Sequence, residues 1–293
     1  MKILVTGASA FIGSSLNELL ADKFEIHAPP SSELNLLNSE DVRNYLKKNS
    51  FDFVIHSANH LVHPLLKESK NPDIQLTNNL KMFFNIAENK DYFGKMIYFG
   101  SGAEFGRENW KSKMKEDFFG NSFPNDQYGL SKYFMNIHCR LSSNIFNLRL
   151  FGMFGIKDDW RFRLIPNLCA QALTSKEIIV NQNAVFSFLY IEDLAAIVEN
   201  FILNTPLSGD YNICPDNEYE LIDIAKIINS LDKEKKIVVK KKGISTKYSG
   251  DNGKLKQAMP NLSFTPINKG IEAVYTFYKK NPEIIDPSKF LIK

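Results

Sequence analysis

Cysteine, long apolar runs and an excess of charge of one sign are all scarce in this sequence. Its three cysteines, Cys139, Cys169 and Cys214, stand singly and far apart, which favours reduced, buried thiols over a disulfide framework or a metal site. No apolar run reaches the roughly 18 residues that a membrane-spanning helix requires. The formal net charge is only +3, too small to indicate a nucleic-acid partner. We therefore expect no bound metal, no membrane contact and no nucleic acid.

The composition is that of an ordinary globular protein. With 293 residues, 44% of them hydrophobic and 24% charged, the chain can form one large α/β domain or a domain with a smaller appendage. Its first residues have a strand pattern and not the charged and apolar pattern of an export signal, so we expect a cytoplasmic protein. One basic cluster, residues 233–242, is interrupted by apolar residues and predicts a solvated strand and turn.

The opening stretch organises the rest of the chain. Lys2–Val5 is a short apolar run of the kind that forms a buried parallel strand, Gly7 follows it, and from Phe11 apolar residues recur at helical spacing. A strand, a glycine turn and a helix in this order direct backbone N–H groups and a positive helix end at one point, where a phosphate or pyrophosphate binds. Ala10 replaces the middle glycine of the usual three, so we expect a slightly wider turn and a retained site.

The first half of the chain alternates predicted strands and helices, a pattern that favours parallel βαβ units. The segment 107–125, rich in Gly, Pro and Asn, predicts an irregular excursion. The expected strands are Lys2–Val5, Phe24–Ala28, Phe53–His56, Lys95–Phe99 and Ile145–Leu150. The expected helices are Phe11–Leu20, Ser39–Lys48, Asp73–Glu88 and Asp126–Ser143.

Past Leu150 the pattern changes to helices separated by short strands. We expect an α/β protein with a Rossmann-type, doubly wound parallel sheet in residues 1–150 and a smaller α/β substrate lobe in residues 151–293, with 186–204 returning to the first domain. A cleft at the carboxyl ends of the strands would be the ligand site. The helices expected in this half are Leu164–Thr174, Ile191–Leu203, Leu221–Leu231 and Lys269–Lys279. The expected strands are Ile178–Val180, Tyr211–Ile213 and Ile237–Val239.

Tyr128 and Lys132 are four residues apart and share one face of a predicted helix. A free tyrosine has a pKa of about 10, and a neighbouring ammonium lowers that pKa toward a value useful for proton transfer. Tyr275 and Lys279 repeat the spacing outside the predicted cofactor-binding half. Ser101 stands at the end of a predicted strand, where its hydroxyl can donate to a substrate oxygen. Ser101, Tyr128 and Lys132 together predict a proton-transfer site.

These motifs resemble those of the extended short-chain dehydrogenase/reductase superfamily, in the branch of sugar-nucleotide epimerases, dehydratases and reductases. Thr6–Gly13 resembles its TGxxGxxG turn, and Val54–Ala58 resembles its strand and loop beside the cofactor. Asn78–Asn79 resembles the helix asparagine that braces the site, and Tyr190–Ala195 resembles a helix entry in the substrate half. The likeness covers nearly the entire chain.

The resemblance implies a role for each residue of the site. Ser101 would polarise the sugar oxygen, Tyr128 would give or take its proton, and Lys132 would bind the nicotinamide ribose. An NAD(P) cofactor would carry the redox step. The cofactor contacts implied in the same way are Gly7, Ser9, Ala10, Phe11, Ile12, Gly13, Ser31, Ser32, Asn35, Leu36, Ser57, Ala58, Asn59 and Asn79, beside Tyr128 and Lys132.

Local departures from the family patterns narrow the expected reaction. Dehydratases of the family have Asp-Glu directly after the catalytic hydroxyl, whereas this chain has Gly102 and Ala103, which cannot transfer protons. Ser32–Asp41 resembles the matching stretch of GDP-fucose synthase-like 4-keto-6-deoxy sugar reductases, which also epimerise with a cysteine at the position of Ala103. We therefore expect reduction of the 4-keto group of a nucleotide-linked deoxy sugar, without epimerisation at carbon.

The residues after the second predicted strand favour NADP(H), with NAD(H) as the other possibility. This strand lacks the terminal Asp or Glu that hydrogen-bonds an unphosphorylated adenosine ribose. Ala28, Ser31 and Ser32 offer small side chains and hydroxyls, and no carboxylate stands there to repel a 2′-phosphate.

The substrate side departs from the family pattern at two positions. Gly152 stands where the family usually has asparagine, and Phe186 where it usually has an arginine that grips the pyrophosphate. Arg161, Arg163 or Lys157 could bind the pyrophosphate instead, and a guanidinium suits a diphosphate especially well. The alternative is that all three are surface charges. The substrate-binding candidates are Glu104, Gly152, Arg161, Arg163 and Phe186.

Two alternative functions stay open at this point. A nucleotide-sugar 4-epimerase would keep NAD tightly bound and return the hydride to the opposite face of the sugar. A non-catalytic dinucleotide-binding protein would show no turnover. Relatives pair through helices that correspond to residues 73–88 and 126–143, so the resemblance also implies a homodimer.

Overall fold

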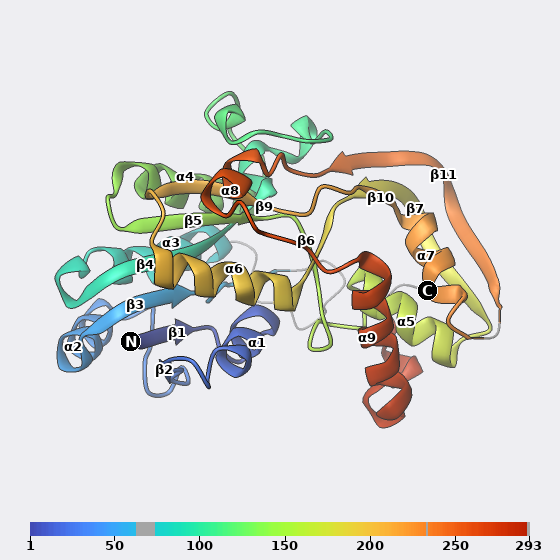
Figure 1. Cartoon of the computed structure of the whole chain (residues 1–293), viewed down its shortest axis with the longest axis horizontal. Coiled ribbons are helices and arrows are strands. Elements are labelled where there is room, and N and C mark those ends of the chain that lie inside the picture. The colour runs from blue at the N-terminus through green and yellow to red at the C-terminus, as the bar shows by residue number, and fades with distance from the viewer. Residues whose placement is uncertain (63–73, 233, 292–293) are drawn as a thin grey trace.

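A fully parallel, six-stranded sheet forms the centre of the structure, a computed structural model that describes residues 1–62, 74–232 and 234–291. The strand order is β2-β1-β3-β4-β5-β9, and the sheet occupies the left half of the view in Figure 1. Its strands are β1 (Lys2–Thr6), β2 (Glu25–His27), β3 (Phe51–His56), β4 (Phe93–Ser101), β5 (Ile145–Leu150) and β9 (Gly209–Ile213).

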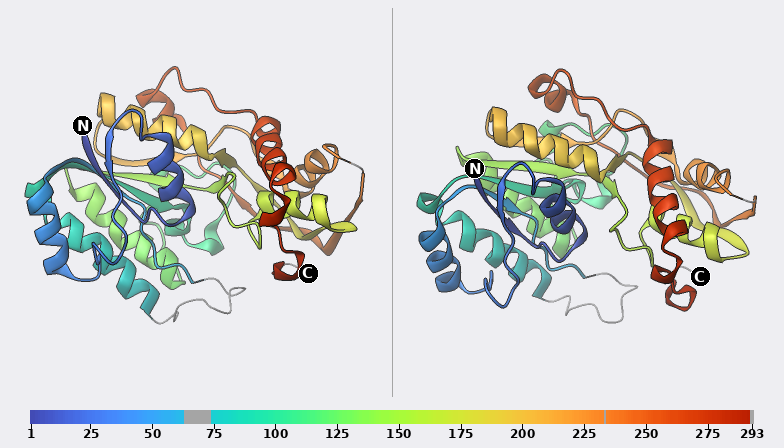
Figure 2. Two further views of the ribbon diagram at one scale, coloured as in Figure 1. Left: turned by 90° about the horizontal axis from the view of Figure 1, so that it is seen from below. Right: turned by 60° about the horizontal axis from the view of Figure 1, so that its bottom comes forward.

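Helices cover both faces of this sheet because its strands are apolar on both sides. Ile3 and Val5 belong to one hydrophobic cluster, which includes α1 (Phe11–Leu19) and α6 (Ile191–Asn204). Leu4 belongs to a second cluster on the opposite face, which includes the remaining helices of this half. These are α2 (Ser39–Asn49), α3 (Gln75–Ala87) and α4 (Gln127–Leu141). Figure 2 shows the two helical layers, and the predicted Rossmann-type, doubly wound fold is confirmed.

A smaller α/β lobe lies beside the carboxyl ends of the main sheet (Figure 1). Its sheet has the order β10-β7-β11, in which β7 pairs parallel with β11 and antiparallel with β10. The strands of this sheet are β7 (Glu177–Phe186), β10 (Tyr219–Glu220) and β11 (Lys236–Tyr248), and the helices are α5 (Leu164–Thr174), α7 (Leu221–Asn229) and α9 (Ile267–Lys280). Between the lobes β6 (Gly152–Phe154) pairs with β8 (Phe188–Tyr190), and α8 (Gly253–Ala258) follows β11.

Short 3₁₀ turns make up much of the excursion after β4, as the sequence predicts for an irregular segment. The 3₁₀ turns after β4 are η3 (Gly102–Phe105), η4 (Arg107–Asn109) and η5 (Glu116–Phe118). Elsewhere in the described chain, η2 (Lys90–Tyr92) precedes β4, and η6 (Pro282–Ile284) and η7 (Pro287–Lys289) follow α9. No helix in the described part of the chain is long and apolar enough to cross a membrane.

Two of the expected strands of the smaller lobe differ from expectation. Tyr211–Ile213 belongs to β9, which pairs with β5 in the main sheet, so its assignment to the smaller lobe is wrong. Ile237–Val239 is only the start of β11, which extends over 13 residues along β7. The predicted helix start at Asp73 and the start of the basic cluster at residue 233 lie outside the described residues. The division of the chain at residue 150 stays a prediction.

The order of the strands reverses at β1, which lies between β2 and β3, and such a switch point opens a crevice at the carboxyl ends of the strands. The loops after β1 and β3 touch there. Gly7 has a φ of +72°, and a Cβ on it would lie 2.6 Å from the backbone nitrogen of Ala58. A Cβ on Gly13 would lie 2.3 Å from the carbonyl oxygen of Gly7. Both glycines are therefore needed for this close backbone packing.

We predict that Gly7→Ala destabilises the protein more than Gly243→Ala. Both glycines have a left-handed φ, +72° and +79°, so either alanine carries a strain of roughly 1–2 kcal/mol. Only the Gly7 variant adds a backbone clash, because nothing lies within 4 Å of a Cβ on Gly243. Urea unfolding should give an additional loss of about 1–3 kcal/mol for Gly7→Ala. Equal losses in the two variants would contradict the packing described.

Candidate active site

The turn between β1 and α1 has free backbone donors where a phosphate is expected. Ala10 occupies the N-cap of α1, and no side chain of the described residues caps this helix end. The first turn of α1 carries no acidic side chain, so no carboxylate opposes an anion. Orphan N–H groups at a helix end are commonly satisfied by a ligand, and this end opens at the switch point. Gly7, Ser9, Ala10, Phe11, Ile12 and Gly13 therefore fit the pyrophosphate of a dinucleotide.

The other predicted cofactor contacts lie on the loops that follow β2 and β3. Ser57, Ala58 and Asn59 are half-buried directly after β3, and the Asn59 side-chain oxygen is buried without a partner among the described residues. Asn79 is only 2% exposed and accepts a hydrogen bond from the His60 backbone nitrogen at 2.7 Å. Asn79 therefore acts by holding this loop. After β2 lie the exposed Ser31, Ser32 and Asn35 and the half-buried Leu36.

The structure brings Ser101, Tyr128 and Lys132 together beside this crevice. Ser101 is the last residue of β4, and Tyr128 and Lys132 lie on the first turns of α4. The Ser101 hydroxyl is near enough to the Tyr128 phenol to lower its pKa. The Lys132 Nζ lies 5.6 Å from the centroid of the Tyr128 ring and donates to the Phe99 carbonyl at 2.8 Å. Two hydroxyls and one ammonium thus share a single site.

Burial and several neighbouring groups act on the pKa of Tyr128. Burial raises the pKa of its phenol, and the largest opposing effects are those of the Ser101 hydroxyl and of the charges of Arg163 and Arg107. Lys132 directs its ammonium at the Phe99 carbonyl, and the lowering of the Tyr128 pKa by Lys132 stays a prediction.

Lys132 itself is 5% exposed, and burial lowers its pKa to about 8, against an opposing effect of the Glu104 charge. Its ammonium also lies 4.7 Å from the centroid of the Tyr98 ring. A lysine with this pKa can release a proton near neutral pH more easily than an exposed one.

Glu104 has no exposed surface, so its prediction as a substrate contact is wrong. One oxygen of its carboxylate accepts from the Ser101 backbone nitrogen at 3.1 Å, and the Ser101 hydroxyl accepts from the Ala103 nitrogen at 3.2 Å. This reciprocal capping box fixes the turn that begins at Ser101. Glu104 contributes to the site by holding Ser101 and not by meeting the substrate.

A buried guanidinium neutralises Glu104. Arg149 on β5 is 0% exposed and donates to Glu104 at 3.0 and 3.1 Å, to Asp210 at 2.5 Å and to Asn212 at 2.9 Å. The carboxamide of Asn147 donates to the same Glu104 carboxylate at 3.1 Å. Sequence reasoning missed this network, although Asn147 and Arg149 alternate within an otherwise apolar strand, where a charge needs a buried partner.

The substrate-side candidates have different surroundings. Arg161 pairs with Asp159 at 2.6 Å, and Lys157 pairs with Glu18. Arg163 is 47% exposed and lies 3.8 Å from a carboxyl oxygen of Asp158.

Gly152 begins β6, which pairs with β8, and Phe186 is the last residue of β7. A Cβ on Gly152 would lie 2.4 Å from the Ser187 carbonyl oxygen, so β6 can approach β8 only with glycine here. Phe186 is half-buried and packs on Tyr248 at 5.3 Å between ring centroids. Packing thus explains why glycine stands at position 152 and phenylalanine at position 186 in place of the usual asparagine and arginine. Both residues stay candidates for substrate contact.

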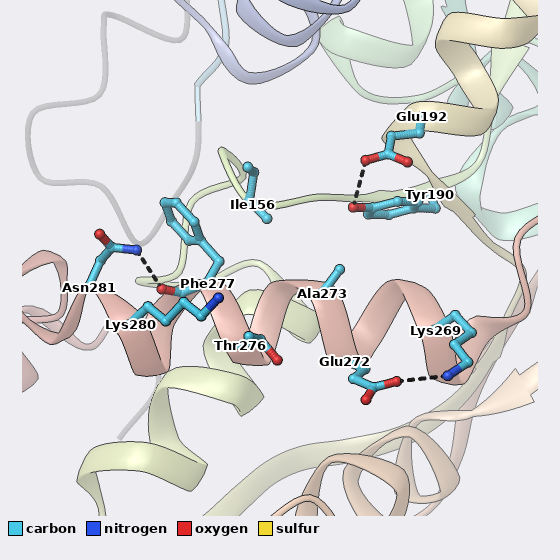
Figure 3. Close-up of a pocket in the computed structure, with 10 residues that line it drawn as sticks. All are labelled: Ile156, Tyr190, Glu192, Lys269, Glu272, Ala273, Thr276, Phe277, Lys280 and Asn281. Atoms are coloured by element: carbon cyan, nitrogen blue, oxygen red, sulfur yellow. Dashed lines mark hydrogen bonds and ion pairs between the residues drawn. The ribbon is translucent and has the colours of Figure 1, made fainter.

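A surface pocket of about 590 Å³ lies between α9 and the start of α6, and Figure 3 shows it. Tyr190 donates to Glu192 on one side, and Lys269 pairs with Glu272 on the other. None of Ser101, Tyr128 and Lys132 lines this pocket. The three cysteines are buried and free, and the described residues contain no cluster that could hold a metal ion.

We predict that Arg149→Met lowers the free energy of unfolding by about 3–5 kcal/mol, because two carboxylates lose their buried cation. Urea unfolding followed by circular dichroism measures the loss. Lys226→Met is the matched control, since its ammonium pairs with Asp223 at 2.9 Å on an exposed helix face. The control should change stability by no more than about 1 kcal/mol. Similar losses in both variants would contradict the importance of the buried network.

Known proteins resemble this chain in sequence and in fold. The chain is 25% identical to GDP-L-colitose synthase of Yersinia pseudotuberculosis over 78% of this chain and 81% of that protein. It is 24% identical to ADP-L-glycero-D-manno-heptose-6-epimerase of Brachyspira hyodysenteriae over 98% of each chain. A GDP-L-fucose synthetase from Naegleria fowleri bound to NADP has the same fold, with a TM-score of 0.82, 18% identity and coverage of 96% of this chain and 93% of that one. Residues 3–214 match the NAD dependent epimerase/dehydratase family, and the chain belongs to that family.

Proposed function

We propose that this protein reduces the 4-keto group of a nucleotide-linked deoxy sugar, with NADPH as the hydride donor. The observation that carries the proposal is the meeting of Ser101, Tyr128 and Lys132 at the carboxyl end of β4, beside the dinucleotide crevice. Glycine and alanine at positions 102 and 103 argue against dehydration, which needs an acid and a base there.

Tyr128 is the proton donor in this proposal. Its hydroxyl gives a proton to the keto oxygen as that oxygen gains negative charge, and a phenolate remains. Ser101 donates a hydrogen bond that stabilises the same developing charge. The ammonium of Lys132 lies close enough to the ring to favour the phenolate, and solvent then restores the Tyr128 proton.

Positive charge near Tyr128 supports an anionic substrate. Arg163 and Arg107 are both near enough to lower the pKa of the Tyr128 phenol. Arg161 is held by Asp159 at 2.6 Å, whereas Arg163 is 47% exposed and lies 3.8 Å from Asp158. Arg163 is therefore the arginine that we propose for the diphosphate of the substrate. GDP- and ADP-linked sugars in the names of the relatives support a nucleoside diphosphate sugar.

The loop after β2 supports NADP(H) as the cofactor. Ala28, Ser31 and Ser32 carry no carboxylate, so the acidic side chain nearest after β2 on this loop is Glu33, and the Naegleria structure carries NADP. We also propose a homodimer through α3 and α4, since Phe134 and Leu141 on α4 are 39% and 85% exposed.

A nucleotide-sugar epimerase is the second candidate, because the similarity to the heptose epimerase of Brachyspira covers nearly the whole length of both proteins. An epimerase would retain NAD through purification and interconvert sugars without net use of NADPH.

We predict that Tyr128→Phe lowers the turnover of NADPH with a GDP-linked 4-keto-6-deoxy sugar by about 100-fold or more, with cofactor affinity little changed. Absorbance at the NADPH band measures the rate. The matched control is Tyr275→Phe, because Lys279 lies 5.7 Å from the Tyr275 ring in the same i, i+4 arrangement, away from the crevice. The control should keep the wild-type rate.

Wild-type turnover in the Tyr128→Phe variant would refute the role of this phenol as proton donor. Retained NAD together with sugar interconversion in the wild-type protein would decide in favour of the epimerase.

We predict that Ala28→Asp weakens NADPH binding at least about tenfold and leaves NADH binding unchanged or improved. The new carboxylate repels a 2′-phosphate and can accept from a ribose hydroxyl. Fluorescence titration with the two cofactors measures the ratio. An unchanged preference would show that residue 28 lies away from the adenosine ribose.

A further inference from the structure

We propose that Arg107, in the turn η4, is a positioning residue of the candidate active site: together with the Trp110 ring it holds the start of α4 against the turn after β4 and thereby sets the distance between Tyr128 and Ser101. The inference rests on the proposed roles of Ser101 and Tyr128. It gives the first part of the irregular excursion after β4 a task in the proposed reaction.

The guanidinium of Arg107 holds the N-terminal cap of α4. Its Nε donates to one carboxyl oxygen of Asp126 at 3.1 Å, and the other oxygen of Asp126 accepts from the Gly129 backbone nitrogen at 2.9 Å. Asp126 is the N-cap of α4, and Tyr128 is the second residue of this helix. A capping carboxylate stabilises the first turn only while its oxygen faces the backbone nitrogens. Arg107 therefore orients the cap that lies two residues before Tyr128.

A second side-chain contact joins the same two segments. The carboxamide of Asn125 donates to a carboxyl oxygen of Glu108 at 3.1 Å. A Cβ on Gly129 would lie 2.7 Å from the Ala103 carbonyl oxygen, so the first turn of α4 packs directly on the turn after Ser101. Two consecutive residues of η4 thus hold the two residues before α4, close to the place where the two backbones touch.

The Trp110 side chain connects Arg107 to the other part of the site. Its indole nitrogen donates to the carbonyl of Gly102, the residue directly after Ser101, at 2.9 Å. The guanidinium carbon of Arg107 lies 5.0 Å from the centroid of the indole, a cation–π contact that orients the planar guanidinium. The Tyr248 ring packs on the same indole at 4.0 Å between centroids and limits its movement. One arginine–tryptophan pair thus contacts both the turn after β4 and the start of α4.

The exposure of the ion pair separates positioning from general stabilisation. The side chains of Arg107 and Asp126 are 50% and 37% exposed, so their contact contributes little to the stability of the whole fold. Proton transfer is more sensitive, because a displacement of about 1 Å between reacting groups can cost roughly 100-fold in rate. Loss of the pair should therefore change the rate much more than the unfolding of the protein.

The first test follows the cap itself by amide hydrogen exchange, measured by NMR. Arg107→Met should speed the exchange of the Gly129 amide about threefold, because Asp126 loses the group that orients it. Trp110→Leu should speed the same amide, since the guanidinium then loses the ring on which it lies. In the Arg107→Met background Trp110→Leu should add nothing, because the two side chains act as one unit.

Two controls separate this local effect from a general loss of stability. The Glu40 amide donates to the Asn38 carboxamide at 3.0 Å in the N-terminal cap of α2, and its exchange should be the same in every variant. Lys111→Met removes a cation that lies 5.2 Å from the centroid of the Phe118 ring in the same excursion. This variant should leave the exchange of the Gly129 amide unchanged.

The second test measures the reduction of a GDP-linked 4-keto-6-deoxy sugar by NADPH. Arg107→Met and Trp110→Leu should each lower kcat about tenfold with KM changed less than about twofold, because the lost contacts act on the geometry of proton transfer. The double variant should be no slower than the slower single variant. Arg107→Lys can still pair with Asp126 and should stay within about threefold of the wild-type rate.

A slow Arg107→Met variant beside a wild-type rate in Trp110→Leu would mean that Arg107 acts through its charge alone, and this result would overturn the proposal. Unchanged exchange of the Gly129 amide in both variants, or equal acceleration in Lys111→Met, would also contradict it. A wild-type protein that reduces no keto sugar would refute the proposed function, whereas hydrogen exchange would still decide whether Arg107 and Trp110 hold the start of α4.

Discussion

The buried guanidinium of Arg149 is the constraint on which the active-site geometry depends. Moving one ion out of water costs several kcal/mol even after relaxation, so Arg149, Glu104 and Asp210 are tolerable only together. Glu104 can reach Arg149 only if the turn after β4 folds back over the end of β5. That turn begins at Ser101, whose backbone nitrogen donates to the same carboxylate. The position of the Ser101 hydroxyl therefore follows from the need to pair one buried charge.

The same network extends into the segments that carry the smaller lobe. Asn212, which accepts from Arg149, donates through its carboxamide to the carbonyls of Met114 and Asp251. Asp251 follows β11 by three residues, so the strand that delivers Tyr248 is tied to the centre of the main sheet. The aromatic contacts of Tyr248 with Trp110 and Phe151 close the gap between the lobes. One continuous network of buried hydrogen bonds thus connects the turn that begins at Ser101 with the residues that follow β11.

Local patterns in the sequence predicted most of the elements and the proximity of Ser101, Tyr128 and Lys132, whose catalytic roles stay a proposal. The predicted bounds of α5 and β5 agree with the structure because apolar spacing and chain punctuation are local properties. The return of residues 209–213 to the main sheet could not be predicted, since pairing with β5 depends on contacts distant in sequence. Glu104 was misassigned for the same reason: a carboxylate three residues after Ser101 is expected to be exposed until its partner Arg149, 45 residues away, is known.

The glycine at position 102 links the reaction class to the packing of Tyr248. In the sequence, Gly102 shows only that this chain lacks the acid that dehydratases have at this position. In the fold the same glycine makes room for a phenol, because any Cβ would collide with the Tyr248 ring. Elimination of water needs both an acid and a base beside the sugar, whereas reduction of a carbonyl needs a single proton. Burial keeps Tyr248 protonated, so it can supply a hydrogen bond but not act as a base. A site in which Tyr128 alone exchanges a proton with the sugar matches the requirement of reduction.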